Sequence, residues 1–281
     1  MEVGVGLPAT IPGASGEHVL EAGRRADSAG FASVGIIDRL VYDNFEPLTT
    51  LAAVAAVTEC VRLTTAILIA PNRGNAALLA KQAASVDAIS GGRLVLGVAI
   101  GARDDDYEAA GVPTKGRGRR LEQYMEELQS HWSEGDIGPK PARAGGPPLW
   151  VGGSVDAAYQ RAAQYDQGWI MGGGTPEMLA EGAEQTRAAF KEAGRDDEPR
   201  IGALAYFALG DTAEEDARSY LGDYYAFMGE SAEMVVQSAA TDEDTIKGYV
   251  QAFEQAGCDE LILFPCSADP EQVELLAKVV L

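Results

Sequence analysis

The chain contains the stretch Leu149-Trp150-Val151-Gly152-Gly153-Ser154, followed closely by Trp169-Ile170-Met171-Gly172-Gly173-Gly174-Thr175-Pro176. Each is a short apolar run that stops at glycines and passes directly into a predicted helix. Glycine lets the backbone turn without a Cβ in the way, and the helix start offers unpaired N–H groups and a positive dipole end. A phosphate or another anion can bind at such a junction. The two junctions therefore predict an anion site in a chain that alternates strand and helix.

The same strand-then-helix pattern repeats along the whole chain. Strands are predicted as short runs rich in Val, Ile and Leu, and a stretch of helical period follows each one. The predicted strands are residues 2–7, 33–38, 63–70, 94–101, 148–153, 169–172, 201–209 and 260–264.

Near-continuous apolar strands are typical of a parallel sheet that is covered on both faces. Eight such units in 281 residues favour a closed (β/α)₈ TIM barrel over an open doubly wound sheet. No linker or break in composition divides the chain, so we expect a single domain over residues 1–281.

Composition excludes two classes of partner. The chain has 43 acidic and 22 basic side chains, for a formal net charge of −21. That charge repels nucleic acid and anionic membrane surfaces, so neither is expected as a partner. The cysteines at 60, 258 and 266 lack metal-ligand spacing and indicate reduced thiols in a cytoplasmic protein. We expect no signal peptide and no membrane span, because the apolar runs are too short.

Five stretches, in order along the chain, carry a family likeness: residues 66–73 (AILIAPNR), 79–87 (LAKQAASVD), 90–98 (SGGRLVLGV), 118–124 (GRRLEQY) and 152–154 (GGS). The most specific part is the Ala-Lys-Gln helix, followed by Ser-Gly-Gly-Arg and a glycine-bearing strand. Together they resemble the bacterial luciferase-like family of flavin- or deazaflavin-dependent oxidoreductases.

The resemblance implies a TIM barrel with the isoalloxazine-type ring of the cofactor at the C-terminal mouth, where barrel enzymes place their chemistry. It implies that the two glycine junctions hold the cofactor phosphate and that the third strand forms the wall behind the ring. A non-prolyl cis peptide bond is expected within residues 67–69. The implied cofactor-binding residues are Ala66, Ile67, Leu68, Gly101, Gly152, Gly153, Ser154, Gly172, Gly173, Gly174 and Thr175.

The sequence also departs from the family pattern. Many relatives place a histidine just after the second strand, where this chain has Asp38-Arg39, and its two histidines, His18 and His131, fall in predicted helices. A histidine-based acid–base mechanism is therefore disfavoured. No basic residue precedes Gly101, where luciferases have an arginine near the phosphate. The short chain predicts a reduced insertion over the mouth, which disfavours an aldehyde substrate and light emission.

Asp38 and Arg73 are the candidate catalytic residues. Asp38 ends a buried strand, where an acid needs a partner. It is expected either to hydrogen-bond the cofactor ring or substrate, or to form a salt bridge with Arg39. Arg73 is expected to meet anionic ring atoms or substrate, or to form a surface ion pair. Tyr124 is equally suited to core packing and to cofactor contact.

The run Asp104-Asp105-Asp106 is predicted to be a solvated acidic turn rather than a metal site, because a metal cage takes ligands from several elements. No other pattern in the chain points to a metal.

The sequence favours a monooxygenase that uses reduced FMN, supplied by a separate reductase, to oxygenate a small organic substrate. Deazaflavin (coenzyme F420)-dependent hydride transfer stays open, with Arg73 and Arg103 as partners for the oligoglutamate tail of that coenzyme. A non-catalytic flavin-binding protein is a further alternative. An aldolase or isomerase is disfavoured, because no lysine lies at a predicted strand end. Relatives commonly dimerise, so a homodimer is expected.

Overall fold

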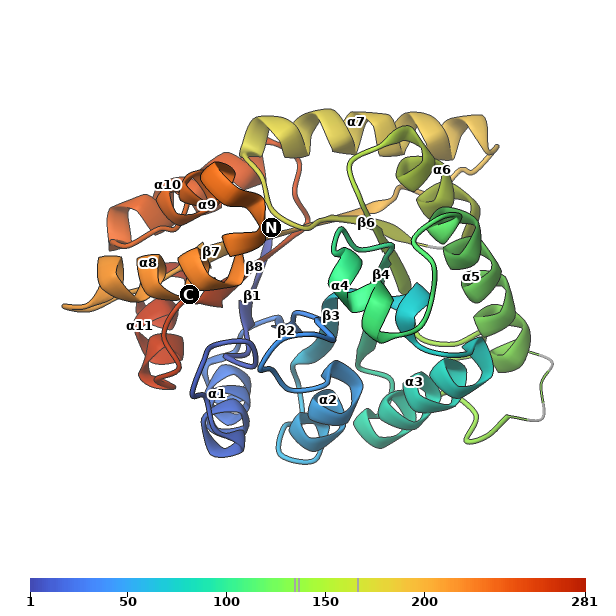
Figure 1. The fold of residues 1–281 in the computed structure, drawn as a ribbon, viewed down its shortest axis with the longest axis horizontal. Coiled ribbons are helices and arrows are strands. Elements are labelled where there is room, and N and C mark those ends of the chain that lie inside the picture. The colour runs from blue at the N-terminus through green and yellow to red at the C-terminus, as the bar shows by residue number, and fades with distance from the viewer. Residues whose placement is uncertain (134, 136, 166) are drawn as a thin grey trace.

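Eight parallel strands close into a barrel in the computed structural model, in the order β1 to β8 with β8 paired back to β1 (Figure 1). The structure describes residues 1–133, 135, 137–165 and 167–281. The predicted TIM barrel is confirmed, and the predicted strand ends differ from the observed ones by at most two residues. The strands are β1 (Glu2–Gly6), β2 (Ser33–Ile36), β3 (Arg62–Ile69), β4 (Leu94–Ala99), β5 (Leu149–Gly152), β6 (Gly168–Met171), β7 (Arg200–Phe207) and β8 (Glu260–Pro265).

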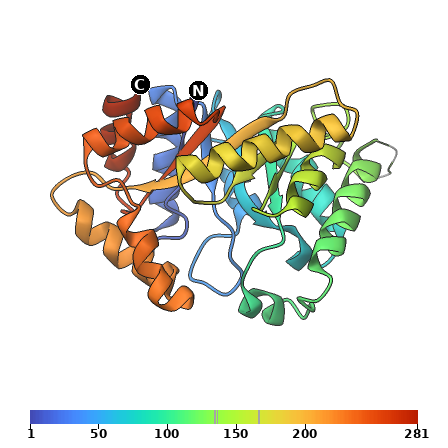
Figure 2. The same ribbon diagram turned by 90° about the horizontal axis from the view of Figure 1, so that it is seen from above.

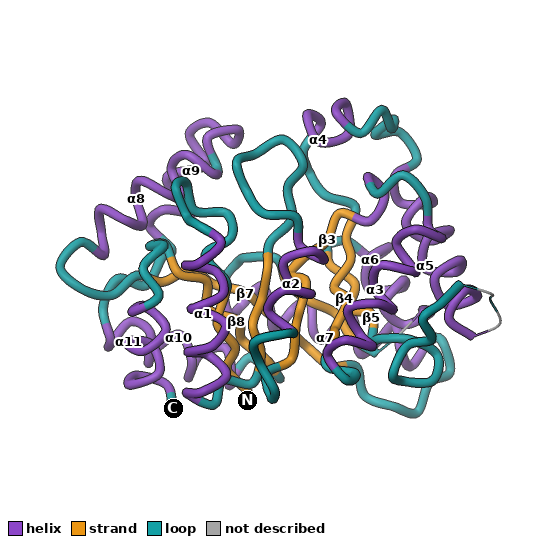
Figure 3. Tube along the Cα trace, turned by 90° about the horizontal axis from the view of Figure 1, so that it is seen from below, coloured by secondary structure: helices purple, strands orange, loops and turns teal. Residues whose placement is uncertain are grey.

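Helices follow the strands and cover the outside of the barrel. They are α1 (Gly16–Ala29), α2 (Pro47–Ala55), α3 (Ala76–Ser90), α4 (Asp104–Ala109), α5 (Arg117–Ser133), α6 (Asp156–Tyr165), α7 (Pro176–Glu192), α8 (Ala213–Tyr224), α9 (Ala232–Gln237), α10 (Glu243–Gln255) and α11 (Glu271–Val280), with 3₁₀ turns η1 (Ala70–Asn72) and η2 (Ala226–Ser231). Both termini lie at one end of the barrel, and α4 and α9 lie at the other (Figures 2 and 3). In the part of the chain that the structure describes, no helix combines the length and the apolarity needed to cross a bilayer.

Large side chains from a few strands fill the barrel interior opposite glycines on others. A Cβ at Gly6 would lie 2.2 Å from Phe264 Cδ1, and one at Gly35 would lie 2.9 Å from Phe264 Cζ. Trp150 fills the space beside Gly168 in the same way, because a Cβ there would lie 2.9 Å from its ring. The middle of the barrel is therefore a packed core.

The N-terminal ends of the strands are closed by charged side chains. Glu260, which is fully buried, accepts hydrogen bonds from Ser33 Oγ at 2.6 Å and from the guanidinium of Arg62 at 2.5 Å. Arg200 lies 3.2 Å from the same carboxylate. Since a buried carboxylate needs such partners, these contacts account for the charged residues at this end of the barrel as structural ones.

Gly97 on β4 lies beside the point where the β3–β4 register shifts, between Thr65 and Leu68. A Cβ on Gly97 would lie 2.1 Å from the Thr65 carbonyl oxygen, which is backbone and cannot turn aside. We expect Gly97→Ala to lower the free energy of unfolding by about 3 kcal/mol, measured by denaturant unfolding. The control is Gly248→Ala on α10, where nothing lies within 4 Å of the added Cβ. That change is expected to be neutral or stabilising by up to about 1 kcal/mol; equal effects would contradict the packing account.

Candidate functional site

A cavity of about 460 Å³ opens at the C-terminal ends of β2 to β7. Its size is that of a site for a cofactor or drug-sized ligand. The lining comes from strand ends, from the loops that follow them and from α8 and η2. The lining residues are Ile37, Asp38, Arg39, Ala66, Ile67, Ile69, Ala99, Ile100, Gly101, Ala102, Arg103, Asp106, Arg117, Gly152, Gly153, Ser154, Val155, Gly172, Gly173, Leu204, Tyr206, Tyr224, Tyr225 and Phe227.

Most of the residues predicted for the site line this cavity together. They are Asp38, Ala66, Ile67, Gly101, Gly152, Gly153, Ser154, Gly172 and Gly173. The non-prolyl cis peptide bond joins Ala66 and Ile67, in the predicted strand but one bond before the predicted interval.

Four predicted residues lie away from the cavity lining. Leu68 is fully buried in the core between the barrel and its helices. Gly174 faces Met171 rather than the cavity, since a Cβ at Gly174 would lie 3.1 Å from the Met171 sulfur. Thr175 caps α7, because its hydroxyl accepts a hydrogen bond from Met178 N at 3.4 Å. Arg73, the fourth, lines a neighbouring cavity.

The two glycine junctions form one wall of the cavity. Gly153 and Gly173 have φ values of +131° and +121°, which side-chain-bearing residues rarely adopt. The first junction leads into α6, and the second reaches α7 three residues after Gly173. The indole N–H of Trp169 donates to Gly153 O at 2.7 Å and fixes the first junction. Two helix starts thus lie beside a concave surface, an arrangement suited to an anion.

Arg117, at the start of α5, supplies a positive charge to the cavity. Three arginines line the cavity, but Arg39 is paired with Asp106 at 2.8 Å and Arg103 with Asp105 at 2.6 Å. In the described part of the chain, Arg117 is the lining cation without an ion-pair partner. The sequence analysis did not single it out, because nothing local shows which side of a helix start faces a strand end.

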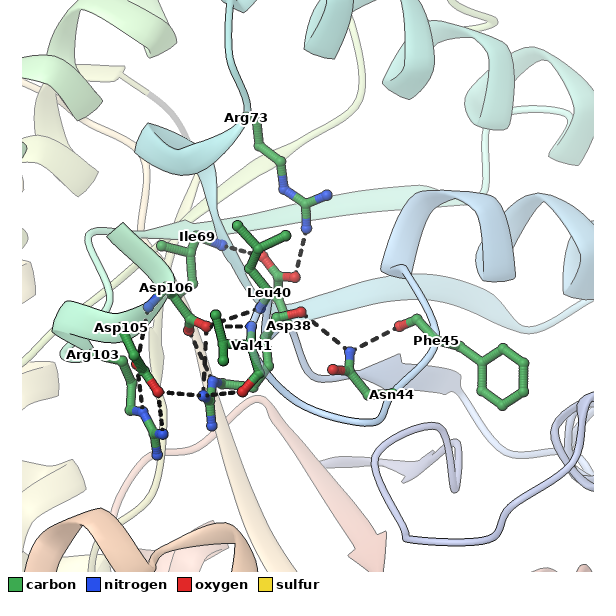
Figure 4. A network of polar contacts seen from close by, with 11 residues as sticks. Asp38, Leu40, Val41, Asn44, Phe45, Ile69, Arg73, Arg103, Asp105 and Asp106 are labelled. Atoms are coloured by element: carbon green, nitrogen blue, oxygen red, sulfur yellow. Dashed lines mark hydrogen bonds and ion pairs between the residues drawn. The ribbon is translucent and has the colours of Figure 1, made fainter. Parts of the chain in front are cut away.

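Asp38 forms a buried ion pair with Arg73 (Figure 4). One carboxylate oxygen lies 2.5 Å from the Arg73 guanidinium, and the other accepts a hydrogen bond from Ile69 N at 2.8 Å. Arg73 also contacts Glu46 at 2.6 Å. The predicted alternative, a salt bridge between Asp38 and Arg39, is therefore wrong, since Arg39 turns away toward Asp106.

The ion pair affects the titration of both groups. Burial raises the pKa of Asp38, and the charge of Arg73 and the Ile69 N–H oppose that rise. Burial lowers the pKa of Arg73, but Asp38 and Glu46 outweigh that effect and raise it overall. The net effect is a raised pKa for Asp38, which Arg73 limits by stabilising the charged form.

The acidic run at the start of α4 is only partly a solvated turn. Asp104 is exposed, but Asp106 is buried and accepts hydrogen bonds from Arg39 Nε at 2.8 Å and Val41 N at 2.7 Å. Hydrogen bonding by Arg103 lowers the pKa of Asp105 to about 2. Among the described residues, no group of three His, Cys, Asp or Glu could hold a metal ion.

Aromatic residues from β7, α8 and η2 form another wall, which the sequence analysis missed. Tyr206 and Leu204 are two residues apart on β7, so their side chains lie on the same face of the strand and both point into the barrel. Tyr224 is the last residue of α8, Tyr225 is its C-cap, and Phe227 follows in η2. The Arg103 guanidinium lies 4.0 Å from the centre of the Phe227 ring, which joins two loops across the rim. Tyr124, by contrast, is buried among core residues and does not line the cavity.

Relatives of known sequence include uncharacterised proteins and enzymes of stated activity. An uncharacterised protein of Mycobacterium tuberculosis is 33% identical over 207 residues, which cover 61% of this chain and 71% of that protein. The FMNH2-dependent dimethylsulfone monooxygenase of Pseudomonas putida is 29% identical over 229 residues, which cover 75% of this chain and 58% of that protein.

Solved structures with the same fold span nearly the whole chain. The monooxygenase RslO1 from Streptomyces bottropensis has a TM-score of 0.81 and 21% identity, over 100% of this chain and 98% of that one. An F420-dependent secondary alcohol dehydrogenase has a TM-score of 0.81 and 18% identity, over 99% and 98%. At these identities the likeness establishes the fold.

The family model described as luciferase-like monooxygenase matches residues 1–278, almost the full length. The resemblance predicted from the sequence motifs is thereby confirmed, and with it the assignment of the chain as an oxidoreductase. The chain belongs to the luciferase-like monooxygenase family.

Proposed function

We propose that this chain uses reduced FMN, supplied by a separate reductase, to oxygenate a small neutral organic molecule with O₂. The observation that carries the proposal is the arrangement of the cavity. Two glycine junctions and one unpaired arginine, Arg117, form an anion-binding end. The wall that β3 contributes next to it is made of apolar side chains. An amphipathic cofactor with a phosphate at one end and a planar ring at the other fits that division.

The residues present fit FMN at both ends. Gly153, Ser154 and Gly173, with Arg117, would hold the phosphate. Ala66, Ile67 and Gly101 would contact the ring. Gly101 has a φ of +68°, and a Cβ at this position would lie 2.9 Å from the Ile69 side chain, so the site requires glycine. FMN would supply the two electrons that O₂ activation requires.

The protein's own contribution is to bind, to orient and to hold a proton. The arginine that pairs with Asp38, Arg73, lies in the neighbouring cavity and not in the cofactor cavity. We therefore assign to Asp38 the hydrogen bond to cofactor or substrate and the proton transfer. Arg73 acts through Asp38 as a positioning residue, because it contacts the carboxylate from the neighbouring cavity. The tyrosines and Phe227 would exclude water from the reacting groups.

Coenzyme F420 is the second cofactor to consider, because it serves relatives of the same fold. The two arginines that the sequence analysis offered for its acidic tail are already paired, Arg73 with Asp38 and Glu46, and Arg103 with Asp105. Those pairs favour FMN over F420.

The test is turnover under ¹⁸O₂ with FMN, a flavin reductase and NADH, across a panel of small neutral ketones, sulfides and sulfones. A product that carries one ¹⁸O atom, and that forms equally when chemically reduced FMN replaces the reductase, is the expected result. Anaerobic reduction of substrate with reduced F420 would replace the proposal with hydride transfer. FMN binding without product from any panel member would indicate a non-catalytic flavin-binding protein.

A further inference from the structure

Four aromatic side chains form a continuous wall of the cavity, here called the tyrosine face: Tyr206, Tyr224, Tyr225 and Phe227. The Tyr225 ring makes an edge contact with Tyr206 at 6.0 Å between ring centres, and with Tyr224 at 5.0 Å. Phe227 stacks on Tyr225 at 6.2 Å, with 29° between the ring planes. The tyrosine face therefore offers both ring edges and ring faces to the cavity, and an aromatic or flat apolar group can pack against either.

The tyrosine face also carries unused hydrogen-bond donors: the Tyr224 hydroxyl has no hydrogen-bond partner among the described residues, and the Tyr206–Tyr225 pair holds another such donor. The hydroxyl oxygens of Tyr206 and Tyr225 lie 2.8 Å apart, so one hydroxyl donates to the other. The second proton of the pair has no further acceptor among the described residues. Burial raises the pKa of both hydroxyls, so both stay protonated near neutral pH. A phenol that keeps its proton offers a hydrogen-bond donor and carries no negative charge with which to form an ion pair.

Charge in the cavity restricts what these donors can meet. Two lining arginines contact the tyrosine face: Arg39 lies 5.7 Å from the centre of the Tyr224 ring, and Arg103 lies 4.0 Å from the centre of the Phe227 ring. Both are already neutralised, by Asp106 and Asp105. Arg117, the lining arginine without an ion-pair partner among the described residues, is assigned to the cofactor phosphate. With the cofactor bound, a carboxylate at the tyrosine face would therefore be buried without a counter-charge, which is costly.

We propose that the tyrosine face is a substrate subsite for a neutral ring-bearing group with an oxygen acceptor, such as an aromatic ketone. The Tyr206–Tyr225 pair donates its free O–H to that oxygen, and Tyr224 and Phe227 pack against the ring. That the bound molecule is a substrate rests on the proposed function, but its recognition can be measured without turnover.

The test compares three probes by calorimetric titration: acetophenone, ethylbenzene, which lacks the oxygen, and benzoate, which is anionic. Each is titrated into the protein with and without saturating oxidised FMN. The double variant Tyr206→Phe/Tyr225→Phe removes both hydroxyls, so it leaves no unpaired buried group and keeps the packing. Tyr249→Phe is the matched control, because the Tyr249 hydroxyl donates a hydrogen bond to Ser238 O at 2.8 Å on the protein surface.

The double variant is expected to weaken acetophenone binding about fivefold and to leave the affinities for ethylbenzene and FMN unchanged. Benzoate is expected to bind most weakly, and Tyr249→Phe to change nothing. Acetophenone affinity within about twofold of wild type, an equal loss for ethylbenzene, or tighter binding of benzoate would each overturn the subsite. Failure of FMN to bind, with the acetophenone effect intact, would instead overturn the proposed cofactor and leave the subsite standing.

Discussion

Replacing Arg73 with methionine is expected to lower the free energy of unfolding by about 3–5 kcal/mol, because the Asp38 carboxylate is left buried without its counter-charge. The Asp38 side chain is only 6% exposed and that of Arg73 17% exposed, so water cannot replace the lost contact. The Ile69 N–H alone remains to hold the carboxylate. Denaturant unfolding of the variant and the wild type measures the difference.

The loss should also depend on pH. Burial already raises the pKa of Asp38, and removal of Arg73 takes away the charge that opposes this rise. When the pKa of a carboxyl group is higher in the folded than in the unfolded protein, its contribution to stability is greatest below the ordinary pKa, which is 3.8 for Asp. That contribution is lost as the pH rises through the folded-state pKa. The stability gap between variant and wild type should therefore be smaller at about pH 4 than at about pH 8.

Arg24→Met is the control for this prediction. Arg24 pairs with Glu21 at 3.4 Å, and the two side chains are 48% and 37% exposed. Removal of that pair should cost less than about 1 kcal/mol at either pH. Equal losses for the two variants, or a gap for Arg73→Met that does not change with pH, would count against a buried ion pair at Asp38.

Arg117→Met is expected to weaken FMN binding roughly 10- to 100-fold, as the loss of one charge-assisted phosphate contact requires. Riboflavin, which has the same ring and ribityl chain without the phosphate, should bind wild type and variant equally well. Fluorescence titrations with both flavins measure the two effects.

Arg119→Met on the same helix is the matched control, since Arg119 is exposed and does not line the cavity. It should leave both affinities unchanged. If Arg117→Met weakened riboflavin as much as FMN, the arginine would support the fold of the cavity rather than the phosphate. No change in either affinity would remove Arg117 from the site.

The barrel could be predicted from the sequence because its strands are buried on both faces. Runs such as Leu94 to Ala99 are apolar at nearly every position, and a helical period follows each of them. The glycine junctions marked the site for a related reason. Gly152 is the last residue of β5 and Gly172 directly follows β6, and the carboxyl ends of all strands in a parallel barrel lie at the same mouth.

Residues that depend on long-range contacts were not predictable in the same way. Tyr206 and Tyr225 meet because α8 folds back over β7, and Arg39 pairs with an acid that lies 67 residues further along the chain. The sequence places Arg39 next to Asp38, but neighbours at a strand end point in different directions. Leu68 was assigned to the cavity, but its side chain points outward into the core beneath the helices.

We propose that the glycine junctions and Arg117 anchor the phosphate of FMN at the barrel mouth. Anaerobic fluorescence titration of the cofactor-free protein with FMN, riboflavin and coenzyme F420, each oxidised and reduced, tests it most directly. The account predicts that reduced FMN binds most tightly, with riboflavin weaker by at least roughly tenfold. Tighter binding of F420, or equal binding of FMN and riboflavin, would contradict it.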